Sequence, residues 1–236
     1  MKKFVSSVLA LTVALNISGC AQSVTYSIMT GNPYALKSDV NSSNVNTPVD
    51  GMTPLVFAVS MNKPEMVKIL IDKQADVNLV NPSTGMTPLV TAIVMSGPEI
   101  KKMLLQAGVD VNKPSTDATT PLQLAAGTSQ TELAKTLIEK GANVNSVDLN
   151  GTTPLIMAAA TANLSLARVL VARGAQINVE DKGGNSPLSL VEVDNVEFIK
   201  FLKDKGANLF YRNAAGRSIA EQRAVFAAQK KAAAAK

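Results

Sequence analysis

Residues 51–56 read Gly-Met-Thr-Pro-Leu-Val (GMTPLV), and the same six letters return at residues 85–90. A Thr-Pro-Leu or Ser-Pro-Leu word then recurs three more times, at steps of 33 residues. The five words begin at Thr53, Thr87, Thr120, Thr153 and Ser186. Self-similarity at a fixed period of about 20–50 residues is typical of repeat architectures, so the sequence predicts an array of similar units.

A second word follows each of these five at a nearly constant distance. It begins with glycine in four units and with glutamine in one, and it continues with a small apolar residue and a polar turn. The five copies are Gln74–Asn78 (QADVN), Gly108–Asn112 (GVDVN), Gly141–Asn145 (GANVN), Gly174–Asn178 (GAQIN) and Gly206–Phe210 (GANLF). Two words in phase over five units leave little room for chance.

Each unit is predicted to be a pair of short helices. Thr followed by Pro places a side-chain acceptor at the N-cap and a preset φ at the first helical position. Leu55 and Ala58 then share one face of a first helix, and Met66 and Leu70 share one face of a second. The glycine that follows supplies a left-handed residue to end the second helix. One such pair cannot bury its apolar face alone, so neighbouring units must stack into an all-α solenoid.

Both words resemble the ankyrin repeat over residues 47–221. The resemblance implies about five full helix-turn-helix repeats in residues 47–215, flanked by degenerate caps. The N-terminal cap is expected to be a half-repeat within residues 20–46, and residues 216–236 are expected to form a C-terminal cap with an Ala/Lys-rich helical tail.

The sequence departs from the family pattern at the residue after each Leu, which is commonly His in ankyrin repeats. The residues at this position are Val56, Val90, Gln123, Ile156 and Ser189. We therefore expect the family's Thr–His hydrogen bond between units to be missing and apolar packing to replace it. Gln74 also stands where a C-cap glycine is expected, and the fifth unit is one residue shorter between its helices.

The N-terminal segment is predicted to be a lipoprotein signal peptide spanning residues 1–19. Two lysines precede a mostly apolar run, residues 4–17, that is shorter than the roughly 20 residues a stable membrane span needs. The run ends in Ile-Ser-Gly-Cys, which resembles the lipobox of bacterial lipoproteins and implies that Cys20 becomes an acylated N-terminus. Cys20 is the only cysteine, so it cannot form an internal disulfide. Ala21 follows it, and this sorting pattern implies the outer membrane, facing the periplasm. Initiation at Met29 instead would give a cytosolic form.

Composition argues against an enzyme and against a nucleic-acid partner. The chain has no His, which excludes serine triads with a His base and HExxH metal sites. It also lacks a P-loop, a GxGxxG, a CxxC and a GxSxG motif. Six of the 23 basic residues lie in the leader or the Ala-rich tail, so the remaining 17 are balanced by 18 acidic residues and no basic stripe results. We expect no cofactor and no metal.

A protein-binding surface is expected where ankyrin repeats usually face a partner. These positions are the residue before each Thr and the residues near the end of each first helix. The residues selected are Met52, Met61, Met86, Met95, Thr119, Thr128, Thr152, Thr161 and Asn185. Methionine is flexible and recurs on adaptable binding surfaces, although it also fills gaps between packed elements. Four methionines in phase on one predicted face favour partner contact.

Small ankyrin lipoproteins of this build resemble immunity proteins, which inhibit secreted phospholipase toxins such as type VI effectors. The resemblance implies a phospholipase partner that is neutralised at the membrane to which Cys20 anchors the chain. Two alternatives remain at this stage. One is a periplasmic scaffold or envelope-stress protection factor without a toxin partner, and the other is an enzyme of unknown type.

Overall fold

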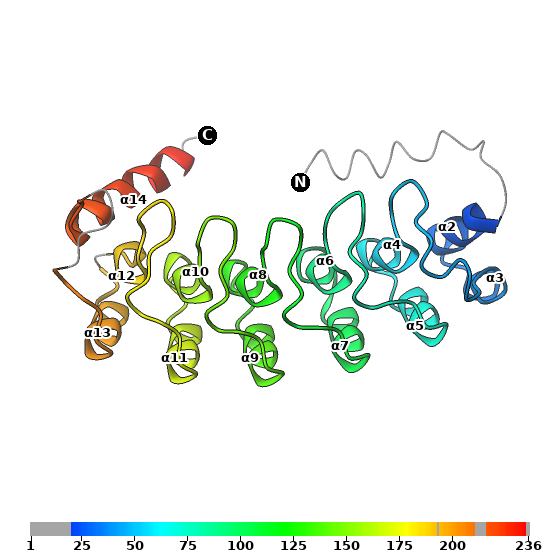
Figure 1. Ribbon diagram of the computed structural model, residues 1–236, viewed down its shortest axis with the longest axis horizontal. Coiled ribbons are helices and arrows are strands. Elements are labelled where there is room, and N and C mark those ends of the chain that lie inside the picture. Colours follow the sequence, from blue (N-terminus) through cyan, green and yellow to red (C-terminus); the bar gives the residue numbers. More distant parts are fainter. Residues whose placement is uncertain (1–19, 193, 211–215, 235–236) are drawn as a thin grey trace.

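The computed structural model describes residues 20–192, 194–210 and 216–234, and within these ranges it contains 13 helices. Most of them form two parallel rows (Figure 1). The inner row consists of α4 (Pro54–Ser60), α6 (Pro88–Met95), α8 (Pro121–Gly127), α10 (Pro154–Ala160) and α12 (Pro187–Leu190). The outer row consists of α5 (Pro64–Asp72), α7 (Pro98–Gln106), α9 (Thr131–Glu139), α11 (Leu164–Ala172) and α13 (Val196–Asp204). The predicted all-α solenoid of five helix pairs is confirmed.

The first word starts every inner helix, as its chemistry predicts. The Thr or Ser hydroxyl accepts a hydrogen bond from the backbone N–H three residues later, at 3.2–3.4 Å, and Pro occupies the first helical turn. The hydroxyl thus satisfies one of the donors that a helix start leaves without a partner. All five N-cap residues are buried, so each of them packs inside the stack of repeats.

The second word ends every outer helix. Glycine takes a left-handed φ of +79° to +92° in four units, which confirms the predicted C-cap. Gln74 holds the same place with φ +64°, although the left-handed region is unfavourable for a residue with a Cβ. The first outer helix therefore ends with backbone strain that the other four avoid.

One continuous core runs between the two rows. Each unit contributes one nearly inaccessible leucine from its inner helix and one from its outer helix, with exposed fractions of 0–3%. The pairs are Leu55 and Leu70, Leu89 and Leu104, Leu122 and Leu137, Leu155 and Leu170, and Leu188 and Leu202. Because each pair packs against the next unit, burial is shared along the whole array.

The N-terminal cap is more complete than the sequence suggested. Residues 20–46 contain two helices, α2 (Cys20–Thr30) and α3 (Pro33–Asp39), where a half-repeat was expected. α2 contacts α4 of the inner row, and α3 contacts α5 of the outer row. Val24 and Ile28 of α2 are buried with the core. The cap therefore copies the helix pair of a full unit, although of the two words it keeps only Asp-Val-Asn, at residues 39–41.

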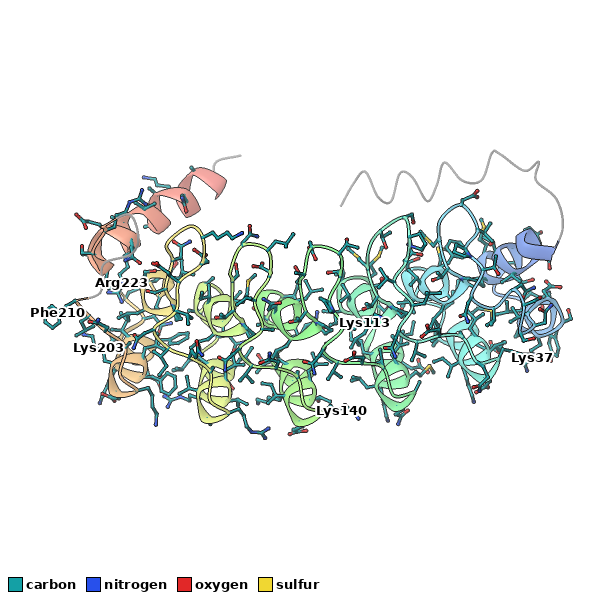
Figure 2. The ribbon with its side chains drawn as sticks, in the orientation of Figure 1. Lys37, Lys113, Lys140, Lys203, Phe210 and Arg223 are labelled. Carbon is teal, nitrogen blue, oxygen red and sulfur yellow. The ribbon has the colours of Figure 1, made fainter. Side chains whose placement is uncertain are left out.

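The C-terminal cap is a single helix, α14 (Ile219–Ala234), which packs on α12 and so extends the inner row alone. The guanidinium of Arg223 on α14 donates hydrogen bonds to the Leu188 carbonyl of α12, at 3.1 and 3.3 Å (Figure 2). In the sequence Arg223 is one of the basic residues of the Ala-rich tail, with no sign of a contact. The structure shows instead that its charged end holds the cap in place.

Candidate protein-binding surface

Between each outer helix and the next inner helix the chain forms a narrow hairpin, here called a finger. The fingers project beyond the inner row, on the side away from the outer row (Figure 1). At the base of each finger a backbone N–H donates to the carbonyl of the residue before Thr or Ser, at 2.9–3.3 Å. These carbonyls belong to Met52, Met86, Thr119, Thr152 and Asn185. Five of the nine predicted contact residues therefore occupy one repeated place in the fold.

The other four predicted residues lie together at the C-terminal ends of the inner helices. Met61, Thr128 and Thr161 are the C-caps of α4, α8 and α10, and Met95 is the last residue of α6. The structure thus sorts the predicted residues into two rows, one along the fingers and one along the inner-helix ends.

Three of the four pairs of adjacent fingers are joined by a backbone hydrogen bond. The Gly51 carbonyl accepts from Ser83 N at 3.0 Å, the Gly85 carbonyl from Thr116 N at 2.9 Å, and the Asn150 carbonyl from Lys182 N at 2.7 Å. These bonds hold neighbouring fingers in register. A partner that contacts several fingers consequently meets a surface that is already ordered, which lowers the entropy cost of binding.

The four methionines divide into two pairs. Met52 and Met61 are partly buried and pack against the core, as gap-filling side chains do. Met86 and Met95 are also partly buried, and Val94 beside Met95 is 46% exposed. The second unit therefore offers more apolar surface to a partner than the first unit does.

The polar members of the predicted set differ in how much surface they offer. Thr128 is exposed, and Thr119 is partly buried. Thr161 Oγ1 donates to the Met157 carbonyl at 3.0 Å, and Asn185 Nδ2 donates to both Asp181 carboxylate oxygens at 3.0 and 3.1 Å. Thr152 is only 8% exposed, so its side chain has little surface to give to a partner.

A buried amide joins the start of α8 to the following finger. Gln123 is fully buried, its Oε1 accepts from Thr120 N at 2.8 Å, and its Nε2 donates to the Thr152 carbonyl. The expectation that this position carries no inter-unit hydrogen bond is therefore wrong for the third unit, because an amide can donate and accept in the place of an imidazole. At the same position of their units, Val90 and Ile156 are buried apolar side chains.

A second buried amide was not anticipated from the sequence. Asn81 lies in the finger before α6 and is fully buried. Its Oδ1 accepts from Thr53 N at 2.8 Å, and its Nδ2 donates to the hydroxyls of Ser83 and Thr84 at 2.9 and 3.0 Å. In the sequence Asn81 stands in a polar turn beside Pro82, where a solvated turn residue is the common case, so the sequence does not mark its burial.

Asparagines make a ladder along the array, and four of them are the last residue of the second word, whereas Asn46 lies in the N-terminal cap. In each rung an Asn Oδ1 accepts a hydrogen bond, at 2.7–2.9 Å, from a backbone N–H in the following unit. The ladder residues are Asn46, Asn78, Asn112, Asn145 and Asn178. The periodic recurrence of Asn was the available signal, but it was interpreted only as a polar turn.

Carboxylates in the fingers accept hydrogen bonds from groups of their own turns. Asp148 Oδ1 accepts from the backbone N–H groups of Asn150 and Thr152, both at 2.8 Å. Asp117 accepts from the Ser115 hydroxyl, and this hydrogen bond is the main cause that lowers the pKa of the Asp117 carboxyl. Asp148 and Asp117 therefore act as turn-capping groups.

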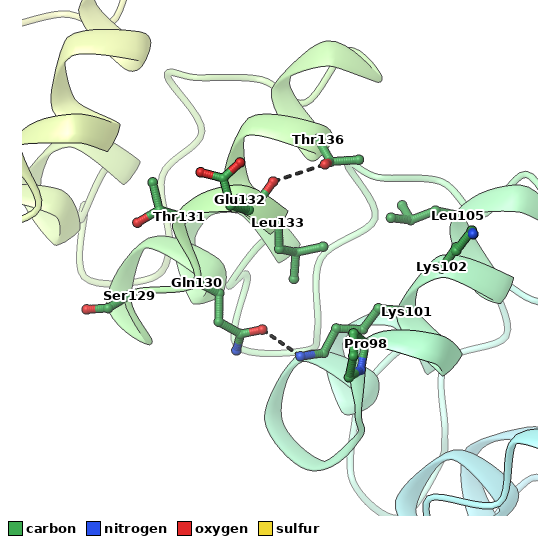
Figure 3. A pocket seen from close by; sticks show the side chains of 10 residues that line it. All are labelled: Pro98, Lys101, Lys102, Leu105, Ser129, Gln130, Thr131, Glu132, Leu133 and Thr136. Atoms are coloured by element: carbon green, nitrogen blue, oxygen red, sulfur yellow. Dashed lines mark hydrogen bonds between the residues drawn. The ribbon is translucent and has the colours of Figure 1, made fainter.

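A groove also opens on the outer row, between α7 and α9 (Figure 3). Its volume is about 610 Å³, and Leu105 and Leu133 lie in its lining. Lys101 donates from Nζ to Gln130 Oε1 at 2.6 Å, and burial lowers the pKa of its ammonium. Gln130 is held in turn by the Ile93 carbonyl at 2.9 Å, so this polar chain ties the outer row to α6.

The described residues hold no group of three or more Cys, Asp or Glu side chains placed to bind a metal ion. Among the same residues, no helix is both long and apolar enough to cross a bilayer. The predicted leader, residues 1–19, lies outside the described residues, as does the side chain of Cys20.

Comparison with known proteins identifies the repeat. A family model described as "Ankyrin repeats (3 copies)" matches residues 13–115 and 112–181. Among solved structures, the human ASB11 ankyrin repeat domain is 26% identical to this chain, with a TM-score of 0.68. That match covers 84% of this chain and 90% of the other. None of the curated proteins searched matches the chain. The two sequence words, the paired helices and the matched family model all agree, and the chain belongs to the ankyrin repeat family.

Proposed function

We propose that this ankyrin array is an immunity protein that binds and neutralises a secreted phospholipase. Ankyrin repeats form a protein-binding module, so the proposal concerns which protein is bound and where. The observation that carries it is the ordered surface made by the fingers and the inner-helix ends, on which eight of the nine predicted contact residues have side chains that are partly or fully exposed.

The attachment site supports a role at a membrane surface. Cys20 is the first residue of α2, and α2 packs directly on the first full unit. Acyl chains on Cys20 would therefore hold the whole array close to the lipid, where a phospholipase must act. An inhibitor tethered there meets the enzyme at its substrate, and its fingers cover the entrance of the enzyme's active site.

The partner is expected to be encoded beside this chain. The test is co-expression of the chain with a lipase from a neighbouring gene, followed by co-purification and a phospholipid hydrolysis assay. We expect a stable complex and loss of hydrolysis. A neighbouring lipase that neither binds the chain nor is inhibited by it would contradict the proposal.

A matched pair of valines maps the contact surface. Val94 is 46% exposed at the end of α6, and Val196 is 69% exposed at the start of α13 on the outer row. Val94→Asp is expected to weaken the complex at least tenfold, since it places a charge in an apolar contact. Val196→Asp is the control and should leave the affinity unchanged. Equal effects of both changes would move the contact away from the inner row.

The alternative function is a periplasmic scaffold or stress-protection factor without a toxin partner. An isolated gene or an envelope-stress operon favours that function, whereas an adjacent lipase gene favours immunity. No residue cluster described above favours the enzyme alternative.

The start at Met29 stays a prediction with a structural consequence. A cytosolic form that begins there would lack Val24 and Ile28, which are 1% and 0% exposed in the cap core. We expect such a form to bind the partner with a less stable N-terminal cap. N-terminal sequencing of cytosolic and membrane pools tests its existence, and a single species starting at Cys20 would exclude it.

A further inference from the structure

The C-terminal ends of α8, α10 and α12 surround a hollow with a volume of about 310 Å³. Its lining includes Ala159, Ala160 and Ala162 around the end of α10, Leu190 at the end of α12, and Glu192. This volume is at the lower end of the range of roughly 300–1,000 Å³ for small-molecule sites. The hollow therefore fits a single long side chain better than a whole cofactor.

The hollow depends on the short length of α12. α12 has four residues, whereas α4, α8 and α10 have seven each. After Leu190 the backbone turns extended at Val191, with φ −71° and ψ 127°, and Glu192 follows directly. The fifth unit, which the sequence shows to be one residue short between its helices, thus brings a carboxylate to the end of the inner row.

The electrostatics of this place favour a cation. Helix C-termini carry partial negative charge, and the hollow is lined by residues at the ends of three helices. The three inner helices contain no charged residue. Glu192 is the one charged residue in the lining of the hollow, and its charge is negative.

The molecule already binds one guanidinium at the neighbouring position. Arg223 reaches from α14 and donates from Nη2 and Nε to the Leu188 carbonyl of the shortened α12. A carbonyl near the end of an inner helix therefore accepts an arginine in this fold. The hollow beside α10 also lies at the end of the shortened α12, and its lining joins alanines and Leu190 to the polar residues Ser129 and Thr161 and to the Glu192 carboxylate.

We propose that this hollow receives an arginine side chain of the protein partner. The aliphatic stem lies on the alanines and Leu190, and the guanidinium lies against Glu192 and the helix ends. Arg suits such a place because it combines an apolar stem with a planar, weakly hydrated cation. The inference deepens the proposed function, since it names the group by which the bound protein is recognised. It requires only that the partner is a protein, whether or not that protein is a phospholipase.

The direct test uses a probe in place of the partner. The full chain is titrated with N-acetyl-arginine methylamide and followed by amide NMR shifts, and N-acetyl-citrulline methylamide serves as the neutral control of the same shape. We expect saturable shifts at Ala160, Ala162 and Leu190 with the arginine probe. The citrulline probe should bind roughly tenfold more weakly, because a hydrogen bond to a charged group contributes about 1.5–3 kcal/mol. Equal binding of the two probes, or shifts confined to other units, would overturn the proposal.

Two variants locate the probe. Glu192→Gln removes the charge and is expected to weaken the arginine probe about tenfold. Ala160→Phe fills the hollow and is expected to abolish saturable shifts, whereas Ala172→Phe, at an exposed alanine that ends α11, should have no effect. Thermal unfolding of each variant checks that the fold is retained.

The same variants separate this inference from the proposed function. Once a partner is in hand, Glu192→Gln and Ala160→Phe should each weaken the complex, while Ala172→Phe should not. If the neighbouring lipase does not bind but the arginine probe does, the phospholipase assignment fails and the arginine site stands. If the lipase binds and neither variant weakens it, the arginine site is overturned and the immunity role stands.

Discussion

The starts of α4 and α8 are each joined to the finger of the next unit by a side-chain amide, and we call each of these places a junction. The amide comes from a different residue in the two junctions. In the first, Asn81 reaches back from a finger to the N–H of Thr53. In the second, Gln123 reaches forward from a helix to the carbonyl of Thr152. Both amides are fully buried, and both join an inner helix to the finger of the next unit.

The comparison shows that the hydrogen bond between an inner helix and the next finger can be made by an amide on either of the two elements. It does not depend on one residue type at one repeat position. Where the helix offers only Val56, the finger supplies the amide. Where the helix offers Gln123, its own side chain completes the bond. A buried backbone group left without a partner is costly in either case, and at these two junctions a polar side chain comes from one side or the other.

The largest effect is expected from Gln123→Leu. The change keeps the side-chain size but removes the acceptor for Thr120 N and a donor to Thr152. Each buried polar group left unpaired costs about 1–3 kcal/mol, so we expect unfolding free energy to fall by about 2–3 kcal/mol. Chemical denaturation followed by circular dichroism measures the loss.

Gln123→Glu is the matched control, because it keeps the acceptor and loses only the Nε2 donor. It should cost less than the leucine variant at a pH where the new carboxyl is protonated. If the leucine variant is as stable as the native chain, apolar packing alone holds this junction and the comparison of the two junctions fails.

Asn81→Leu is expected to cost about 1–2 kcal/mol, since one buried N–H, that of Thr53, loses its acceptor. Asn81→Asp keeps an oxygen for that N–H, and the hydroxyls of Ser83 and Thr84 can turn to donate to the second oxygen. The aspartate variant should therefore lie between the native chain and the leucine variant in denaturant midpoint. The opposite order would show that the amide donors, not the acceptor, hold this finger.

The sequence predicted most of the fold but only some of the contacts between repeat units. The helix starts, the glycine C-caps and the leucine core follow from local rules, because each depends on residues within one unit. Asn81, Gln123 and the ladder asparagines make hydrogen bonds between units. In the sequence, a polar residue that makes such a bond cannot be told from a polar residue of an exposed turn. The candidate surface was predicted in part. Its residues could be placed by phase, but the burial of Thr152 depends on packing that no single unit reveals.

A smaller effect is expected at the one outer helix that ends without glycine. Gln74 has φ +64°, so Gln74→Gly should raise the unfolding free energy by about 0.5–1 kcal/mol through relief of backbone strain. Gly108→Ala is the reverse change, at φ +79° with open space around the added Cβ, and it should cost a similar amount. A glycine variant that melts below the native chain would mean that the Gln74 side chain stabilises more than its backbone costs.

The smallest effect concerns pH. The Ser115 hydroxyl lowers the pKa of Asp117, so the ionised carboxylate stabilises the third-unit finger. This contribution is fully present above the unfolded pKa of about 3.9 and is lost as the pH falls through the folded value. Between about pH 5 and pH 2, the native melting temperature should therefore fall more than that of Asp117→Asn. Parallel curves would exclude a stabilising role for this carboxylate.

The asparagine ladder has a mechanical consequence. Every rung of the ladder connects one unit only to the next, so no rung ties the two ends of the array together. A force applied along the chain is then resisted by one interface at a time, and the array yields by peeling units from an end while the rest keeps its shape. A protein bound across several units would then be released one unit at a time as the array unfolds from an end.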